Sequence, residues 1–596
     1  MEIQEKINQI DIENFPIFEL DNIIKEHKPY FKKIFTLFQQ KLDQINQNEG
    51  SLLQFAKSYQ KYGFNITQDY LIYKEYAPMA KEVYLFGEFN NWNRTQYPLI
   101  RDQYGNFEIK IPLKNSNKPI IPHNTRIKAH VVTQSDKGVD RIPVWCKKLY
   151  QNNQNKIFDG LFWHPDPPYS FRNPKPQKKH ALKIYQVHIG ISGKEPCIYT
   201  FNEFRKNILP RIKNLGYNCI LLMALAEHAY YGSFGQHVTN LFAISSRFGT
   251  PEELKMLIDD AHGMDLHVLM NIVHSHASNN VNDGFNQWDG SDFQYFKGNH
   301  DLWDSKIYNY NLYEVQRLLL SNLAWFMIEY NMDGFRFDGV GSMLYTHHGI
   351  GVQFNGNYKE YFNDSTTDFD AIVYLMLSNL LVHTIYEDAI TIAEDVSGYP
   401  NLSRSILEGG IGFDYILFMD VPDMLIAFKQ KKEEDLIIQD IIQTLIKRKN
   451  DEKCIVYVEC HDQTLYGFMT LSNLLFDQDI YEQMSVFIKE NANTERGMYL
   501  HKIIRLITIG LGGEGYLNFM GNEYGHPEYI DFPREDNGYS YNLCRRRWDL
   551  VDDKLMKFRY LNSYENYTIG TNIEEDHIII LDTDQQKFGG HNKVQQ

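Results

Sequence analysis

The chain has 596 residues, of which 43% are hydrophobic, and its formal net charge at pH 7 is −16. This length predicts either several domains or one large barrel with smaller attachments. The acidic balance argues against nucleic acid or an anionic membrane surface as the main partner, whereas it raises no objection to a neutral polymer.

The six cysteines are widely scattered and form no CxxC pair. The first residues, Met-Glu-Ile-Gln-Glu-Lys, show no basic region followed by an apolar one, so we expect no secretory signal. No apolar run approaches the length of a membrane span. We therefore expect a cytoplasmic protein that carries thiols instead of disulfides, has no membrane or nucleic-acid partner and is a monomer.

Residues 1–59 are predicted to form an N-terminal helical segment. Apolar residues recur at helical spacing over 21–45, and Asp21 stands where a helix N-cap is expected. We interpret this stretch as an amphipathic helix that docks on the rest of the protein and carries no chemistry.

From residue 60 to 155 the hydrophobic period changes to two, which is typical of strands with one buried face. Phe107, Ile109 and Ile111 alternate with charged residues, and turn signals break the runs. A small β-sandwich fits this pattern best. Trp92 lies in one of the turns, where it could equally stack on a sugar or pack against the turn itself.

After a proline-rich boundary, apolar strand-like runs alternate with helical patterns over 156–560. Eight strands that alternate with helices are the number found in a (β/α)8 TIM barrel, so we predict the α/β class with this barrel as the largest domain. The connection over 274–310 is long enough to suggest an inserted subdomain. The predicted strands are 184–188, 219–223, 268–273, 334–338, 391–394, 413–417, 455–459 and 516–520.

Polar side chains stand at the ends of these strands, where sites in this fold collect. Two follow the third strand, two lie on the fourth, one ends the fifth and two follow the seventh. They are Asn271, His276, Arg336, Asp338, Glu394, His461 and Asp462. Chance is an unlikely source for so many polar groups at one mouth.

Two of these carboxylates have the surroundings that retaining glycoside chemistry needs, with the two groups about 5–5.5 Å apart. Asp338 is two residues from Arg336, which keeps the acid ionised and suits a nucleophile. Glu394 follows the apolar run 390–393, a setting that raises the pKa of a carboxyl group and suits a proton donor. The pair His461 and Asp462 could hold sugar hydroxyls and help to distort the ring.

Competing motifs are weaker. Residues 510–515 formally match GxGxxG, but they precede a strand instead of following one, so we interpret them as a turn. His274 and His276 could be metal ligands, yet no third ligand stands at a spacing typical of metal-binding motifs. We therefore expect no metal. The sequence contains no GxSxG elbow and no Walker loop.

Several longer strings resemble a known family. GFRFDGV (334–340), AEDVSG (393–398) and ECHDQ (459–463) are similar to the sequence regions of the α-amylase superfamily, glycoside hydrolase family 13. AEHAYYGSFG (226–235), FMGNEYGHPEYIDFPR (519–534) and CRRRW (544–548) resemble the eukaryotic glycogen (1,4-α-glucan) branching enzymes. The resemblance covers about residues 60–560, and EFNNW (88–92) marks the β region as similar to the family's carbohydrate-binding module.

This resemblance implies a retaining double displacement on glycogen or another α-1,4-glucan, without cofactor, nucleotide sugar or metal. Asp338 would be the nucleophile, Glu394 the acid/base and Asp462 the stabiliser of the transition state. Transfer of the cut chain to a 6-hydroxyl would then make an α-1,6 branch. The remaining substrate-binding positions would be His276, Arg336, His461, Gln236, Asn271 and Trp92.

The sequence departs from the family pattern in three places. Gln236 stands where the family has a sugar-stacking tyrosine, and losing that ring would cost about 1 kcal/mol of binding. Asn271 replaces an aspartate, and residues 561–596 resemble only a truncated remnant of the family's C-terminal β domain. Two functions therefore stay open, an active branching enzyme and a catalytically impaired glucan-binding paralogue.

Overall fold

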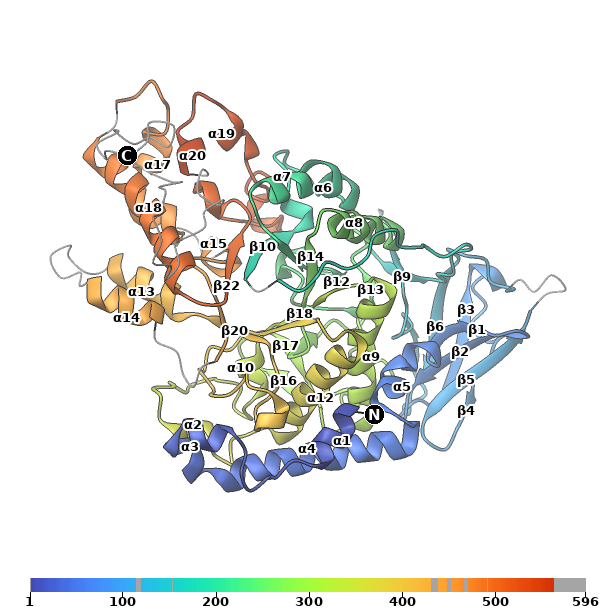
Figure 1. The fold of residues 1–596 in the computed structure, drawn as a ribbon. Coiled ribbons are helices and arrows are strands. Elements are labelled where there is room, and N and C mark those ends of the chain that lie inside the picture. Colours follow the sequence, from blue (N-terminus) through green and yellow to red (C-terminus); the bar gives the residue numbers. More distant parts are fainter. Residues whose placement is uncertain are drawn as a thin grey trace. The chain divides into compact units, whose positions relative to one another are not determined.

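The computed structural model describes residues 2–113, 119–152, 154–179, 181–429, 438–446, 452–465, 470–489 and 491–561. Its central element is a closed barrel of eight strands in the order β10-β11-β14-β18-β19-β20-β21-β22 (Figure 1). These strands are β10 Leu182–His188, β11 Cys219–Met223, β14 His267–Ile272, β18 Gly334–Phe337, β19 Ile390–Ala393, β20 Tyr415–Phe418, β21 Cys454–Val456 and β22 Gly515–Phe519. The predicted (β/α)8 barrel is confirmed.

Helices follow the strands as the predicted alternation requires. The longer ones are α8 Pro251–Gly263, α9 Tyr313–Glu329, α12 Phe369–Ile385, α13 Asp420–Lys429, α14 Ile438–Ile446 and α18 Ala492–Leu511. The shorter ones are α6 Phe201–Asn207, α7 Leu209–Asn214, α10 Val340–Met343, α11 Tyr358–Tyr361, α15 His461–Leu465, α16 Leu471–Phe476, α17 Asp479–Glu482, α19 Trp548–Asp552 and α20 Phe558–Leu561. No described helix combines the length and the apolar content needed to cross a membrane.

The chain forms two compact units. The first comprises Met1–Lys175, Met223–Asp260 and Leu269–Ile416, and the second comprises Pro176–Leu222, Ala261–Val268 and the described parts of Leu417–Gln596. Strands β18 and β19 therefore belong to the first unit, while β10, β21 and β22 belong to the second.

In the first unit, the register of the parallel strands fixes which residues stand side by side. Asn271 of β14 pairs with Arg336 of β18, and Phe337 pairs with Ala393 of β19. All four residues of β18 and of β19 are buried, which explains why, apart from Arg336, these strands carry no charged residue. Asp338 and Glu394 follow the last residues of these two neighbouring strands and thus lie at their carboxyl ends.

The long connection after β14 contains a small sheet of its own. Strands β15 His276–Ser278, β16 Phe296–His300 and β17 Ser305–Tyr308 form an antiparallel sheet in the order β15-β17-β16. The predicted inserted subdomain over 274–310 is confirmed. It carries His276 on its first strand.

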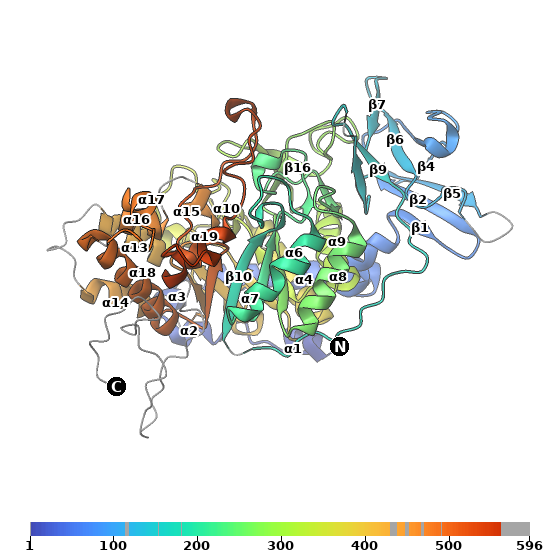
Figure 2. The same cartoon turned by 90° about the horizontal axis from the view of Figure 1, so that it is seen from above.

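The β region forms two sheets, whose strands are drawn in blue to teal in Figure 2. One sheet has the order β1-β2-β5-β4, with β1 Gly63–Ile66, β2 Tyr70–Tyr76, β4 Ile100–Arg101 and β5 Asn106–Pro112. The other contains β3 Glu82–Gly87, β6 Arg126–Val132, β7 Gly138–Arg141, β8 Leu149–Gln151 and β9 Phe158–Leu161. Alternate residues of β6 are buried, as the period of two predicts.

The N-terminal segment differs from the prediction of one helix over 21–45. The structure has α3 Asn22–Glu26 and α4 Lys28–Glu49, preceded by α1 Glu2–Asn8 and α2 Ile17–Leu20 and followed by α5 Leu52–Ala56. Asp21 does cap α3, since its carboxylate accepts a hydrogen bond of 2.8 Å from the N–H of Ile23. The interruption at His27 has a physical reason in Pro29, which has no N–H to continue the hydrogen bonds of α3 but fits the first turn of α4.

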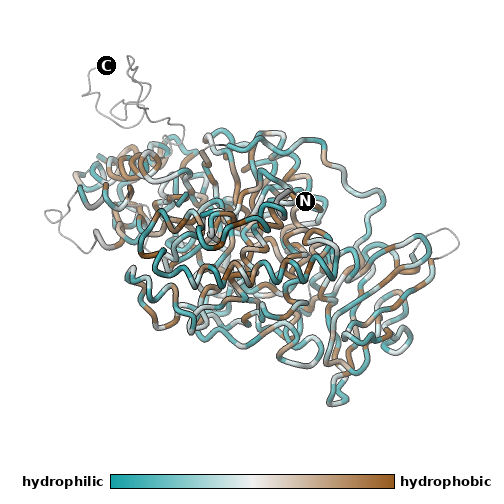
Figure 3. Tube along the Cα trace, turned by 60° about the horizontal axis from the view of Figure 1, so that its bottom comes forward, coloured by the Kyte–Doolittle hydropathy of each residue, from teal (hydrophilic) through white to brown (hydrophobic). Residues whose placement is uncertain are grey.

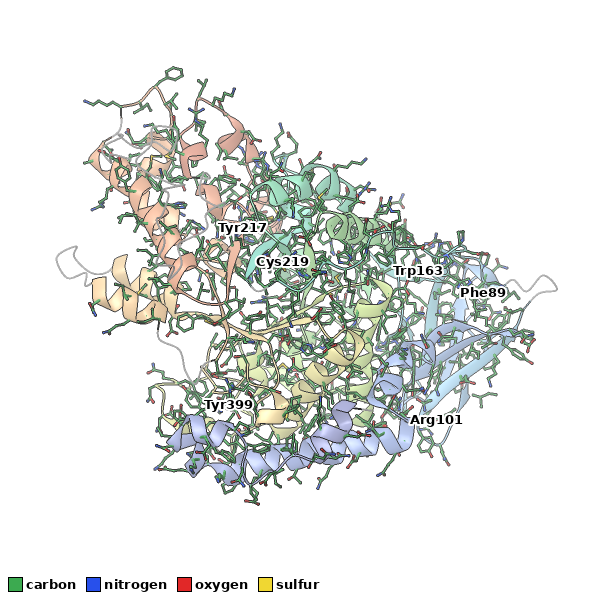
Figure 4. The ribbon with its side chains drawn as sticks, viewed as in Figure 1. Phe89, Arg101, Trp163, Tyr217, Cys219 and Tyr399 are labelled. Atoms are coloured by element: carbon green, nitrogen blue, oxygen red, sulfur yellow. The ribbon has the colours of Figure 1, made fainter. Side chains whose placement is uncertain are left out.

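Helix α4 attaches the N-terminal segment to the barrel helices of the first unit. It packs against α12, and its turns of mixed hydropathy can be followed in Figure 3. At its end Glu49 accepts a hydrogen bond of 2.7 Å from Arg317 of α9. Near its start the hydroxyl of Tyr30 lies 3.1 Å from that of Thr367 and 3.3 Å from that of Tyr399, which is labelled in Figure 4.

This packing predicts that α4 contributes to the stability of the first unit. Phe38 is completely buried on the inner face of the helix, so Phe38→Ala should cost about 3–5 kcal/mol and lower the transition temperature in a thermal unfolding experiment. Gln40→Ala changes an exposed residue of the same helix and should leave the transition unchanged. Equal behaviour of the two variants would show that α4 is dispensable for stability.

Candidate active site

A single buried guanidinium connects three polar side chains at the carboxyl ends of the strands. Arg336 donates to the Oδ1 of Asp338 at 2.6 Å and to the Oε1 of Glu394 at 2.8 Å. The same side chain donates a hydrogen bond to the amide oxygen of Asn271. Only 1% of the arginine side chain is exposed, so the two carboxylates are brought together by one cation in a low-dielectric setting.

Glu394 follows the buried apolar strand β19 and also contacts two hydrogen-bond donors. Its second carboxylate oxygen accepts a hydrogen bond of 2.8 Å from the N–H of Gly339, and its first contacts Arg336. Both contacts favour the ionised form, whereas apolar surroundings alone would favour the neutral acid. The strand before Glu394 is buried and apolar, as predicted, and the structure adds these two donors to the surroundings of the carboxylate.

Asn271 keeps the hydrogen bond that a carboxylate would make at this position. Its side chain is buried, and its amide oxygen faces Arg336. The amide therefore preserves the geometry while leaving the guanidinium with two negative partners among these three side chains.

His276, on the first strand of the inserted subdomain, is a buried histidine that is neutral at pH 7. Burial lowers the pKa of His276 to about 4, although the charge of Asp338 acts in the opposite direction. The imidazole of His276 bonds the Ser275 hydroxyl at 2.9 Å and the main chain of Gln236. Gln236 is half-buried, so the structure brings this position of the sequence next to His276.

Trp303 was not among the predicted site residues. Its ring stacks on His300 with centroids 3.9 Å apart and lies 4.9 Å from the ring of His276. The indole remains 37% exposed, so it offers an aromatic surface beside the histidines. No strand-end pattern marks this part of the insertion, and the signal in the sequence is the string LWDS (302–305), which resembles the branching-enzyme family.

His461 and Asp462 belong to the second unit. Strand β21 ends at Val456, three residues earlier than predicted, and His461 begins the short helix α15. The Nδ1 of His461 lies 3.1 Å from the side-chain amide of Gln186, and its Nε2 lies 3.3 Å from the Oδ1 of Asp462. The two predicted residues thus contact each other.

The loop that carries this pair is fixed by a buried arginine of α18. Arg505 donates to Glu459 at 2.6 Å and to Asn518 of β22 at 2.8 Å. Burial raises the pKa of the Glu459 carboxyl, and the neighbouring guanidinium opposes this effect. Arg505 thus connects the loop after β21 to strand β22 through these two contacts.

Two competing motifs find structural explanations. His274 is buried and both of its ring nitrogens are engaged, Nδ1 with the Tyr374 hydroxyl at 2.5 Å and Nε2 with Asn322 at 3.0 Å. It is therefore a core histidine and does not form a ligand pair with His276. Residues 512–514 connect α18, which ends at Leu511, to β22, which begins at Gly515, so the turn predicted over 510–515 is confirmed only for its middle residues.

Trp92 lies in the β-sandwich. Its ring is half-buried against Phe86 with centroids 5.7 Å apart, and the guanidinium of Arg126 lies 5.6 Å from its centroid. These residues line a surface hollow together with Arg94, Lys128, Asp140, Asn152, Asn155, Ile157 and Asp159. The turn packing is thus observed, and one edge of the indole still reaches the hollow.

Two family models match the chain. Carbohydrate-binding module 48 (isoamylase N-terminal domain) matches residues 61–146, and the alpha amylase catalytic domain matches residues 207–304. Among solved structures, the catalytic module of the pneumococcal protein SpuA has a TM-score of 0.62 at 14% identity, covering 86% of this chain and 82% of that one. A GBS pullulanase in complex with maltotetraose has a TM-score of 0.61 at 14% identity, covering 85% and 72%. The fold and the strand-end carboxylates define a protein with an α-amylase-type barrel.

Curated relatives are far more similar. A 1,4-alpha-glucan-branching enzyme of Rhizophagus irregularis is 45% identical over 97% of this chain and 93% of its own length. The enzymes so named from Equus caballus and Yarrowia lipolytica are 44% and 50% identical, over 97% and 87% of this chain and 91% and 77% of their own lengths. The chain belongs to the family of 1,4-alpha-glucan-branching enzymes.

The lowered pKa of His276 predicts how the free energy of unfolding changes with pH. In the unfolded chain this histidine takes up a proton as the pH falls through about 6.5, whereas in the folded protein it stays neutral down to about pH 4. The unfolded state thus binds more protons in this window, so His276 lowers stability as the pH falls. His276→Gln should therefore lose less stability than the wild type between pH 8 and pH 5.

The measurement is the transition temperature of both proteins at the two pH values. His27→Gln, which changes a half-buried histidine of the N-terminal segment, provides the control and should follow the wild type. If His276→Gln also follows the wild type, the histidine titrates in the folded protein and is not held neutral.

Proposed function

We propose that this protein cleaves an α-1,4 linkage of a glucan and transfers the released chain to a 6-hydroxyl, which creates an α-1,6 branch. Membership of the branching-enzyme family supports this function. The observation that carries it is the position of Asp338 and Glu394 on one buried guanidinium at the ends of adjacent strands. The proposal makes the chain an active enzyme, and the comparisons lend no support to an impaired paralogue.

In the first step, a carboxylate oxygen of Asp338 attacks the anomeric carbon while the bond to the leaving O4 breaks and Glu394 gives its proton to that oxygen. The contact with Arg336 supports the role of Asp338, because it favours the charged nucleophile. Glu394 must carry a proton at this stage. We therefore infer that glucan binding loosens its contacts with Arg336 and Gly339.

In the second step, the 6-hydroxyl of another glucosyl unit attacks the same carbon, its proton passes to Glu394 and the ester bond to Asp338 breaks. Net retention at the anomeric carbon follows from the two displacements. The protein and the glucan supply every group that reacts, so the two displacements require no cofactor and no metal.

The remaining site residues would hold the sugar. We propose that Asp462 stabilises the transition state and that His461, His276 and Arg336 contact the hydroxyls of the transferred unit. Neutral imidazoles such as His276 can both donate and accept hydrogen bonds, which suits uncharged hydroxyls. Gln236 and Asn271 would complete the pocket in the first unit.

We propose the domain division 1–59, 60–155, 156–560 and 561–596, with glycogen as the natural glucan and the cytoplasm as the compartment of a monomeric enzyme. The match of residues 61–146 to a carbohydrate-binding module supports the second domain and a glucan-binding role of Trp92. The prediction of a truncated β remnant after residue 560 falls almost entirely outside the described residues.

The roles of the two carboxylates predict the behaviour of their amide variants. Asp338→Asn should abolish branching, since an amide cannot form the covalent intermediate, and Glu394→Gln should lower the rate by about 10²–10⁴-fold. The assay follows the loss of iodine colour of amylose and the appearance of α-1,6 linkages. Asp388→Asn, an exposed carboxylate just before β19, should retain full activity. Branching by Asp338→Asn at the wild-type rate would exclude Asp338 as the nucleophile.

The amide at position 271 predicts a shift in pH dependence. Asn271→Asp adds a negative charge to a guanidinium that already bonds Asp338 and Glu394, and a like charge raises the pKa of a neighbouring carboxyl group. Because Glu394 must be protonated to act as an acid, the basic limb of the kcat/KM profile should move to higher pH. Asn363→Asp adds the same charge at an exposed position and should leave the limb unchanged. If the basic limb of Asn271→Asp stays in place, the charge at position 271 does not affect the pKa of Glu394.

A further inference from the structure

Three consecutive residues of the second unit place metal-ligand atoms together. The Sγ of Cys460 lies 3.2 Å from the Oδ2 of Asp462, and the Nε2 of His461 lies 3.3 Å from the Oδ1 of the same carboxylate. One ligand atom from each of the three residues lies within 4.8 Å of the other two. It is the only such cluster among the described residues.

The chemistry of the cluster matches one class of ion. A thiolate, an imidazole nitrogen and a carboxylate oxygen are the three ligand types of zinc, with distances of about 2.0–2.3 Å. In a tetrahedral site such ligands lie about 3.3–3.6 Å apart, so the observed spacing requires only small side-chain movements. Calcium and magnesium prefer oxygen ligands and would not use the thiol.

The surroundings hold two of the ligands in place. The side-chain amide of Gln186 contacts the Nδ1 of His461, so the Nε2 faces Asp462. The main-chain N–H of Cys460 donates a hydrogen bond of 2.8 Å to the side-chain oxygen of Gln463, and this bond fixes the start of α15. Cys460 and His461 are buried, whereas 32% of the Asp462 side chain is exposed, so an ion can reach the cluster from that side.

We propose that Cys460, His461 and Asp462 form a binding site for zinc or a similar thiophilic divalent cation, and that the bound ion inhibits the enzyme. This ion is an inhibitor and takes no part in the reaction. The inhibition rests on the proposed function, in which His461 and Asp462 contact the glucan. A metal that occupies their Nε2 and carboxylate atoms removes them from the sugar, so zinc and glucan compete.

The binding step is tested by absorption spectroscopy of the reduced, metal-free protein, independently of activity. Titration with Co²⁺ should give one equivalent of a thiolate-to-cobalt charge-transfer band in the near ultraviolet, and Zn²⁺ should displace it. Cys460→Ser should lose the band, and Cys197→Ser, which changes the exposed cysteine, should keep it. The serine still offers a hydrogen-bond donor to Asp462, and equal transition temperatures would show that both variants fold.

The inhibition step is tested with the branching assay. Zn²⁺ should inhibit the wild type and Cys197→Ser, with relief by a chelator or by excess glucan. Without metal, Cys460→Ser should branch amylose normally, and it should need at least about tenfold more zinc for the same inhibition, since even outer-shell partners are worth that much.

Two results would overturn parts of the proposal in distinguishable ways. A cobalt band of unchanged strength in Cys460→Ser would exclude the site. A band that depends on Cys460 without any zinc inhibition would keep the site but remove the inhibition, and with it the contact of His461 and Asp462 with the glucan. Loss of branching in Asp338→Asn is unaffected by either result, so the proposed function is judged separately.

Discussion

The burial of the Arg336 guanidinium is the constraint on which the site in the first unit depends. A buried cation is costly unless charged and polar partners compensate it, and here two carboxylates and one amide do so. Removing one partner leaves the charge uncompensated, whereas keeping all of them holds Asp338 and Glu394 at a fixed place. The same contact that orders the carboxylates also favours their ionised forms, so chemistry at Glu394 depends on what the substrate does to this contact.

The rest of the first unit supports that arrangement from two sides. The parallel register of β14, β18 and β19 sets Asn271 beside Arg336 and brings both strand ends to one edge. The inserted sheet then adds His276 on β15 and His300 at the end of β16, and Trp303 of the following loop stacks on His300. Burial lowers the pKa values of His276 and His300 to about 4, so these two imidazoles are polar but uncharged at neutral pH. A neutral, hydroxyl-rich polymer is the kind of ligand that such imidazoles suit.

The second unit has its own buried ion pair, between Arg505 of α18 and Glu459 of the loop after β21, and Arg505 also donates a hydrogen bond to Asn518 of β22. Two residues further along, the loop turns into α15 and exposes Asp462 beside Cys460 and His461. The rigidity that would position Asp462 for a sugar also keeps a thiol and an imidazole next to it. The proposed sugar-binding residues His461 and Asp462 thus lie beside a thiol, and together the three side chains offer the ligand types of zinc. The proposed sensitivity to zinc would then depend on Cys460.

The sequence by itself predicted the eight barrel strands, because buried parallel strands are rich in apolar residues. It located Asp338 and Glu394 because each stands at the end of such a strand. It could not show the break at His27, since the helical period continues across it and only Pro29 signals the interruption. Tertiary structure decided the partners. The bond between Arg336 and Asn271 depends on strand register, the position of Trp303 on the fold of the insertion, and the contact of Cys460 with Asp462 on the turn into α15. Such contacts join side chains through backbone geometry, which local composition and periodicity do not encode.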